Sequence, residues 1–163
     1  AGGILILILK PFKVGDYIDD GTNAGHVREI QIFYTYVTTF RNEEIIIPNG
    51  KLSNNAVKNS TYHDKRRLDM LFGISYGDDM NKAIGLLHDL VKADDRILTD
   101  PASVIFVETL NNSSVDIKVR MWTAIENYWA VYIDMTGKVK ATFDENDITI
   151  PFPQRDVHMR QVN

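Results

Sequence analysis

Residues 2–18, GGILILILKPFKVGDYI, join a run of six bulky apolar side chains to a segment with two lysines, a proline and a Gly-Asp turn. The apolar run is shorter than the about 20 residues that a membrane-spanning helix needs. Lys10 and Pro11 end it with a charge and a helix breaker. From these residues alone two interpretations are open: a buried strand, typical of Ile-rich runs of this length, or the last turns of a membrane helix that enters water at Lys10.

The following segment, residues 13–60, shows the pattern of several short strands. Residues 32–40, IFYTYVTTF, are rich in the β-branched and aromatic side chains that strands favour. Pro48-Asn49-Gly50 stops the last apolar run. Several strands without a long helix predict a small closed or nearly closed barrel. The expected strands are residues 17–19, 26–30, 32–40 and 45–47.

Residues 61–153 show a different, mixed pattern. Asp78 is expected to cap a helix whose apolar residues repeat at helical spacing. Residues 115–122 alternate between apolar and charged side chains, as a half-buried strand does. The expected elements follow the βαββαβ order of ferredoxin-like folds: strand 67–76, helix from 78, strands 104–110 and 115–122, helix 127–144 and strand 148–152.

The tail, residues 154–163, follows Pro151-Phe152-Pro153 and is expected to be extended. Val157 and Met159 alternate there with His158 and Arg160. The tail lies outside both expected domains, so a strand here would need a partner for its backbone groups.

Composition excludes several classes of protein. The chain of 163 residues is 44 % apolar and 25 % charged, which indicates a folded protein rather than a disordered one. Its net charge is −4, and residues 61–150 carry ten basic and fifteen acidic groups, which argues against a dedicated nucleic-acid binder. The absence of cysteine excludes disulfides, thiolate metal sites and a cysteine nucleophile.

No motif in the sequence indicates an enzyme, a cofactor or a metal site. The four histidines show no metal-ligand spacing, and no nucleophile elbow or phosphate-binding loop is present. The basic run Lys65-Arg66-Arg67 opens a domain of RNA-binding topology, but the stacking aromatic residues of that module are missing from residues 114–122. Asn59-Ser60-Thr61 and Asn112-Ser113-Ser114 fit the glycosylation pattern, which we attribute to chance.

Five blocks of sequence together resemble one known family. Their order and spacing are similar to those of the small-conductance mechanosensitive channels of bacteria, over essentially the whole chain. The blocks are KPFKVGDYI (10–18), GHVREIQIFYTYVTTF (25–40), EEIIIPNGKLSNNAVKN (43–59), RRLDMLFGISYGDDMNKA (66–83) and ITIPFPQRDVHM (148–159).

This resemblance implies a homoheptamer in the cytoplasmic membrane, with most of this region in the cytoplasm. In the family, the last membrane helix lines the pore and leads into a β domain resembling Sm-type barrels, an α/β domain and a C-terminal strand. Seven copies enclose a vestibule, and membrane tension opens the pore to ions and small solutes. A soluble module that binds RNA or peptide is the alternative.

The resemblance also assigns the parts of this chain. Since the first residue is Ala1, we expect an upstream segment whose pore-lining helix ends in residues 1–12. Residues 13–60 would form the Sm-like domain, 61–153 the ferredoxin-like domain and 154–163 the strand of an oligomeric barrel. The expected site residues are a hinge and membrane-proximal group, Lys10, Pro11, Phe12, Lys13 and Gly15, and an oligomerisation group, Val157, Met159 and Arg160.

The two lysines of the first group would contact lipid headgroups or membrane-helix loops. The family more often carries arginine at these positions, and lysine lacks the bidentate geometry of arginine.

Overall fold

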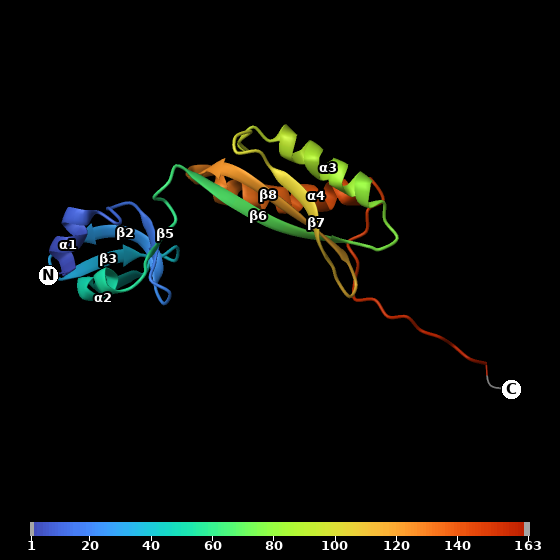
Figure 1. The fold of residues 1–163 in the computed structure, drawn as a ribbon. Helices are drawn as coiled ribbons and strands as arrows, with labels where there is room; N and C mark the ends of the chain where they lie inside the picture. Colours follow the sequence, from blue (N-terminus) through green and yellow to red (C-terminus); the bar gives the residue numbers. More distant parts are fainter. Residues whose placement is uncertain (1, 162–163) are drawn as a thin grey trace. The chain divides into compact units, whose positions relative to one another are not determined.

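The computed structural model describes residues 2–161, which divide between Asp64 and Lys65 into two compact units (Figure 1). Each unit has its own antiparallel sheet and its own apolar core. The chain is therefore an α+β protein, as predicted.

The first unit contains a five-stranded sheet in the order β4-β3-β2-β1-β5. Strands β4 and β5 are its two edges, so hydrogen bonds do not close this sheet within the described residues. A nearly closed, Sm-like barrel stays a prediction. The elements are α1 (Gly2–Leu9), β1 (Tyr17–Asp19), β2 (Ala24–Ile30), β3 (Tyr34–Thr38), β4 (Glu44–Pro48), α2 (Asn49–Asn54) and β5 (Lys58–Asn59).

Residues 2–9 form a helix, so the interpretation of this run as a buried strand is wrong. Two glycines let α1 approach the rest of the unit closely. A Cβ on Gly3 would lie 1.9 Å from the carbonyl oxygen of Ile32, and one on Gly2 would lie 2.8 Å from the carbonyl carbon of Asn49. The side chain of Ile6 then enters the core of the unit, which also contains Phe12, Ile18, Val27, Val37, Ile47 and Leu52.

The second unit is a three-stranded sheet in the order β6-β8-β7 with both long helices on one face. The alternating pattern of β8 places Ile117, Val119 and Met121 in the core, where they meet Leu87 of α3 and Phe143 of α4. The elements are β6 (Lys65–Ile74), α3 (Met80–Ala93), β7 (Val104–Leu110), β8 (Val115–Ala124), a 3₁₀ turn (Ile125–Asn127) and α4 (Tyr128–Glu145).

The fourth strand of the βαββαβ prediction, residues 148–152, is not formed. Thr149 lies beside the end of β6, where its carbonyl oxygen accepts a hydrogen bond from the Ser75 N–H at 2.9 Å. No regular ladder continues from this contact within the described residues, since Pro151 and Pro153 have no N–H to donate. Three of the four strands expected of a ferredoxin-like domain are therefore present.

The cap of α3 also differs from the prediction. The Asp79 carboxylate, not that of Asp78, accepts the helix N–H of Lys82 at 3.0 Å. The Asp78 carboxylate instead accepts the N–H groups of Ser75 and Thr149, at 3.1 and 2.7 Å. Asp78 thus ties the chain after α4 to the end of β6.

Residues 155–161 of the tail are exposed and form no strand within this single chain. The Gln154 N–H donates to the Ser113 hydroxyl at 3.0 Å, which joins the beginning of the tail to the β7–β8 hairpin. Of the helices in the part of the chain that the structure describes, none combines the length and the apolarity needed to span a bilayer.

Candidate functional site at the end of helix α1

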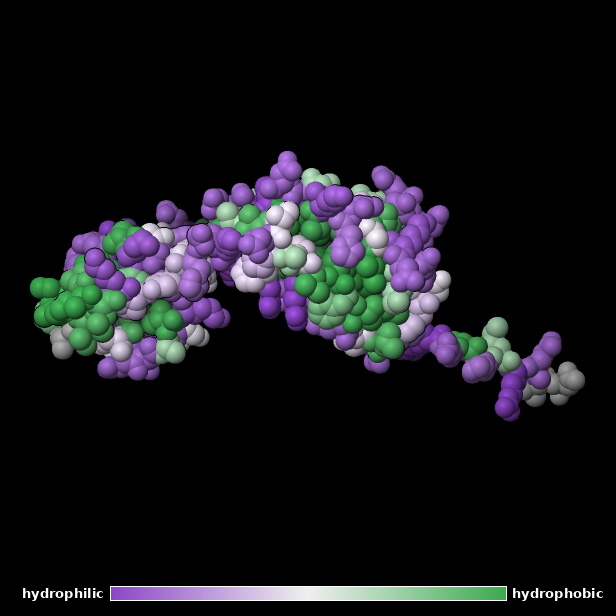
Figure 2. Space-filling view, turned by 45° about the horizontal axis from the view of Figure 1, so that its top comes forward, coloured by the Kyte–Doolittle hydropathy of each residue, from purple (hydrophilic) through white to green (hydrophobic). Residues whose placement is uncertain are grey.

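Helix α1 has no polar side chain, and most of its apolar surface is uncovered. Only Gly3 and Ile6 are buried, whereas Ile8 and Leu9 are 69 and 72 % exposed. Apolar side chains gather at this end of the first unit (Figure 2). A contiguous apolar surface of this kind marks a site that contacts lipid or protein. The other exposed large residues of the helix are Ile4, Leu5 and Leu7.

The chain leaves α1 through a tight turn with two positive φ angles. Lys10, at φ 48°, takes the left-handed conformation that commonly ends a helix, and its N–H donates to the Ile6 carbonyl at 2.9 Å. Phe12 then inserts into the core and is 2 % exposed. Gly15, at φ 95°, donates its N–H to the Val27 carbonyl at 2.7 Å. The left-handed backbone at Gly15 favours glycine, because it has no Cβ.

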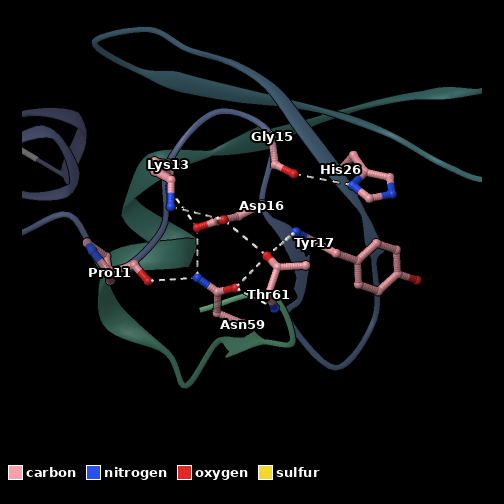
Figure 3. A network of polar contacts seen from close by, with 8 residues as sticks. All are labelled: Pro11, Lys13, Gly15, Asp16, Tyr17, His26, Asn59 and Thr61. Atoms are coloured by element: carbon pink, nitrogen blue, oxygen red, sulfur yellow. Dashed lines mark hydrogen bonds and ion pairs between the residues drawn. The ribbon is translucent and has the colours of Figure 1, made fainter. Parts of the chain in front are cut away.

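Asp16, directly after this turn, has a carboxylate that is buried and surrounded by donors (Figure 3). Its Oδ2 accepts the Lys13 N–H and the Asn59 Nδ2, both at 3.0 Å. Its Oδ1 lies 3.1 Å from the Thr61 hydroxyl. We call these three side chains, Asp16, Asn59 and Thr61, the clasp.

Two further bonds connect the clasp to the backbone on both sides of Asp16. The Asn59 Nδ2 also donates to the Pro11 carbonyl at 3.1 Å, and the Tyr17 N–H donates to the Thr61 hydroxyl at 3.0 Å. The clasp therefore joins the chain that leaves α1, residues 11–17, to residues 59–61, which precede the second unit.

The charge of the clasp follows from these contacts. Burial by itself raises the pKa of the Asp16 carboxyl, but the hydrogen bonds that it accepts, first that from Asn59, outweigh burial and hold the pKa below its ordinary value. The Lys13 ammonium lies 3.6 Å from Oδ1, although its side chain is 75 % exposed. At neutral pH the clasp thus holds a buried carboxylate whose main partners are uncharged.

The five residues of the first predicted group all lie in this one turn. Lys10 and Lys13 point their side chains toward solvent, Pro11 and Gly15 contribute backbone groups, and Phe12 is the apolar anchor. The other group, Val157, Met159 and Arg160, lies in the exposed tail of the second unit.

Sequence reasoning missed the clasp itself. It identified Gly15-Asp16 only as a turn, and it noted Asn59-Ser60-Thr61 only for a chance match to the glycosylation pattern. Asn59 ends strand β5 and Thr61 lies in the turn that follows it. Nothing in the sequence indicated that these side chains meet Asp16, more than 40 residues earlier.

The basic run at the start of β6 is engaged within the unit. The Arg66 guanidinium lies 4.0 Å from the ring centroid of Tyr128, and Arg67 pairs with Asp69 at 2.7 Å. Lys65 donates to the Asp100 carbonyl at 3.2 Å. Within residues 2–161, no three histidine or acidic side chains are grouped to hold a metal ion.

Comparison with protein families identifies both units. Residues 1–62 match the model described as "Mechanosensitive ion channel, beta-domain", and residues 68–150 match "Mechanosensitive ion channel MscS, C-terminal". The chain belongs to the mechanosensitive ion channel family. It is thus related to channels and not to enzymes.

Curated relatives and solved structures agree with this family. The small-conductance mechanosensitive channel of Edwardsiella ictaluri is 40 % identical over 161 residues, which are 99 % of this chain and 56 % of that protein. An MscS family protein of Archaeoglobus fulgidus is 35 % identical over 155 residues, 95 % of this chain and 55 % of that protein. This chain therefore spans a little over half the length of such relatives.

Among solved structures, the closed state of Helicobacter pylori MscS superposes with a TM-score of 0.91 at 27 % identity, over 99 % of this chain and 64 % of that one. Arabidopsis thaliana MSL1 has the same fold, with a TM-score of 0.77 at 14 % identity, over 93 % of this chain and 57 % of that one.

Proposed function

We propose that this chain is the cytoplasmic part of a homoheptameric, tension-gated channel in the cytoplasmic membrane of a bacterium. The channel releases ions and small solutes when hypo-osmotic shock stretches the membrane. The chain supplies the end of the pore-lining helix and the wall of a vestibule below the pore. Family membership of both units, over nearly the whole chain, supports this function.

Helix α1 is the observation that carries the proposal. It is apolar on every side, lies against the β domain through its glycines and leaves five large apolar side chains exposed. A helix of this kind is stable when lipid or neighbouring helices cover its remaining surface. Lys10 and Lys13 follow where the chain would reach water, and their exposed side chains would meet anionic headgroups.

The tail supports the oligomeric part of the proposal. Residues 155–161 are extended and exposed, with Val157 at 76 % and Met159 at 92 % exposure. A ring of seven such segments would pair their backbone groups and cover these side chains, which no single copy can do. Val157, Met159 and Arg160 would lie in that ring.

Gating follows from the position of the turn. Tension favours the state with the larger area in the membrane plane, so the pore helices tilt in a two-state shift. Residues 9–15 would be the pivot, because the left-handed Lys10 and Gly15 bracket it and Phe12 anchors it in the β domain.

The test is tension-activated current from the intact gene product in reconstituted membrane patches, together with its subunit number by native mass spectrometry. We expect a current that rises steeply with suction and a mass of seven subunits. A protein that stays closed up to patch rupture, or that is a monomer, contradicts the proposal. A variant without residues 155–163 should form fewer heptamers, and an unchanged oligomer would exclude the tail from assembly.

The acidic excess of residues 61–150 gives the vestibule a testable charge. A negative wall concentrates cations near the pore. Neutralising aspartates and glutamates of this segment should move the reversal potential of the intact channel away from cation preference. An unchanged reversal potential rejects the filter.

A further inference from the structure

We infer that the clasp of Asp16, Asn59 and Thr61 is a mechanical coupler, which makes the residues after α1 and those before the second unit move as one body. Asp16 is its positioning residue, since every other member of the clasp donates to it. This inference rests on the proposed function for its role in gating, while the coupling itself is a property of the chain alone.

The hydrogen bonds of the clasp connect distant parts of the chain. Each partner of the clasp lies more than 40 residues from Asp16 along the chain, so the bonds are not part of a local turn. Asn59 uses one amide nitrogen to reach both the Pro11 carbonyl and the Asp16 carboxylate. A displacement of Pro11 therefore strains the bond between Asn59 and Asp16 (Figure 3).

Thr61 takes part in several hydrogen bonds of the clasp at once. Its hydroxyl oxygen accepts the Tyr17 N–H at 3.0 Å and lies 3.1 Å from both the Asp16 Oδ1 and the Asn59 Oδ1, which compete for its one proton. The Thr61 N–H donates to the same Asn59 Oδ1 at 3.1 Å. All three side chains thus depend on one another, and the loss of Asn59 or Thr61 removes a hydrogen bond from the buried Asp16 carboxylate.

Strand β5 is too short to make this connection by itself. It consists of Lys58 and Asn59 and pairs only with Ile18 and Asp19 of β1. The Ser60 N–H adds one more bond, to the Tyr17 carbonyl at 3.1 Å. The side chains of the clasp therefore extend the attachment beyond the ladder, as far as Thr61, three residues before Asp64 ends the first unit.

A second buried carboxylate in the same unit provides a matched control. The Asp20 carboxylate accepts Lys51 at 2.9 Å and the N–H groups of Thr22 and Asn23 at 2.8 and 2.7 Å. It joins the β1–β2 loop to α2 and touches neither Pro11 nor residues 59–61. Asp16→Asn and Asp20→Asn each remove the charge of a buried carboxylate in the same unit, but only Asp16→Asn releases the clasp.

Amide hydrogen exchange on the 163-residue chain tests the coupling. In Asp16→Asn, the Lys13 and Thr61 amides should exchange about five- to tenfold faster together, because the two ends of the clasp open in one step. Asp20→Asn should leave both amides unchanged. Acceleration at Lys13 alone, or equal acceleration in Asp20→Asn, overturns the coupler.

Substitution of Thr61 separates the hydroxyl from the shape of the side chain. Thr61→Val removes the hydroxyl and should accelerate exchange at Lys13, on the other side of the clasp. Thr61→Ser keeps the hydroxyl and should restore slow exchange. A Thr61→Ser variant that behaves as Thr61→Val contradicts a role for this hydrogen bond.

Tension recordings on the intact channel test the role in gating. With the clasp released, α1 no longer carries the second unit with it, so Asp16→Asn should open at lower tension than the unsubstituted protein and Asp20→Asn should not. A midpoint that does not fall, or that falls equally in both variants, overturns the role in gating. Absence of current from the unsubstituted protein is a different result: it refutes the proposed function and leaves the exchange experiment to decide the coupler.

Discussion

Helices α1 and α3 differ in how much of their apolar surface this chain covers. Helix α3 begins at a side-chain cap, Asp79, and buries Ala83 and Leu87 while its charged residues face water. Helix α1 has no polar face, and only Gly3 and Ile6 are covered. The chain alone therefore completes α3, whereas α1 needs further apolar partners.

The same leucine substitution in each helix is the strongest test of this difference. Leu87 of α3 is 1 % exposed, and Leu87→Ala should destabilise the second unit by about 2–5 kcal/mol, because it removes buried surface and leaves a cavity. Leu9 of α1 is 72 % exposed, and Leu9→Ala should change stability by less than about 0.5 kcal/mol. Urea unfolding of the 163-residue chain measures both effects, and comparable losses would contradict the comparison.

A glycine in each helix tests how α1 is attached. Gly3→Ala places a Cβ 1.9 Å from the Ile32 carbonyl oxygen, so α1 must move away at a cost of about 1–3 kcal/mol. Amide exchange at residues 6–10 should become faster as α1 loosens.

Gly85 of α3 is the matched control for this substitution. A Cβ there meets no atom within 4 Å, so Gly85→Ala should stabilise the second unit by about 0.5–1 kcal/mol. If Gly3→Ala left exchange in α1 unchanged, close approach through glycine would not be what holds this helix.

The end of α3 gives a smaller effect that depends on pH. Asp94 ends this helix, and its carboxylate accepts the Arg96 guanidinium at 2.8 and 2.9 Å. The hydrogen bond from Arg96 holds the pKa of Asp94 below its ordinary value in spite of burial. Asp94→Asn should therefore cost about 1–2 kcal/mol at pH 7.

The pH dependence of this effect follows from the direction of the shift. A lowered pKa in the folded state contributes stability above the ordinary pKa of about 4 and loses it as the pH falls through the folded value. The difference between Asp94→Asn and the unsubstituted chain should shrink between pH 4 and pH 2 in urea titrations. A difference that stays constant over this range would show that the charge of Asp94 does not contribute.

Elements whose signals are local were predicted well. Strand β7 occupies the expected residues 104–110, and α3 and α4 follow their apolar repeats. The strand predicted at residues 148–152 is not formed. Its apolar residues favoured a strand, but Pro151 and Pro153 cannot donate the backbone hydrogen bonds of a ladder. The cap of α3 was misplaced by one residue because Asp78 and Asp79 are equally good caps in sequence, and only the position of Thr149 separates their roles.

The clasp lay beyond local signals for a different reason. Asp16, Asn59 and Thr61 are ordinary polar residues of turns and strand ends, and no spacing links the first to the other two. Their meeting depends on the pairing of β1 with β5, with Asn59 opposite Ile18. Long-range strand pairing of this kind is a property of the whole sheet.

From its sequence by itself, this protein has an α+β fold, an apolar run that ends at Lys10-Pro11 and the set of side chains available to its cores, because period, charge and turn residues act over a few neighbours. Only the tertiary structure decided that α1 approaches Ile32 through Gly3, that Asp78 binds Thr149 and that Asp16 closes the clasp. The physical reason is that a buried polar group takes whichever partners the packed chain brings within hydrogen-bonding distance, and sequence separation does not limit that choice.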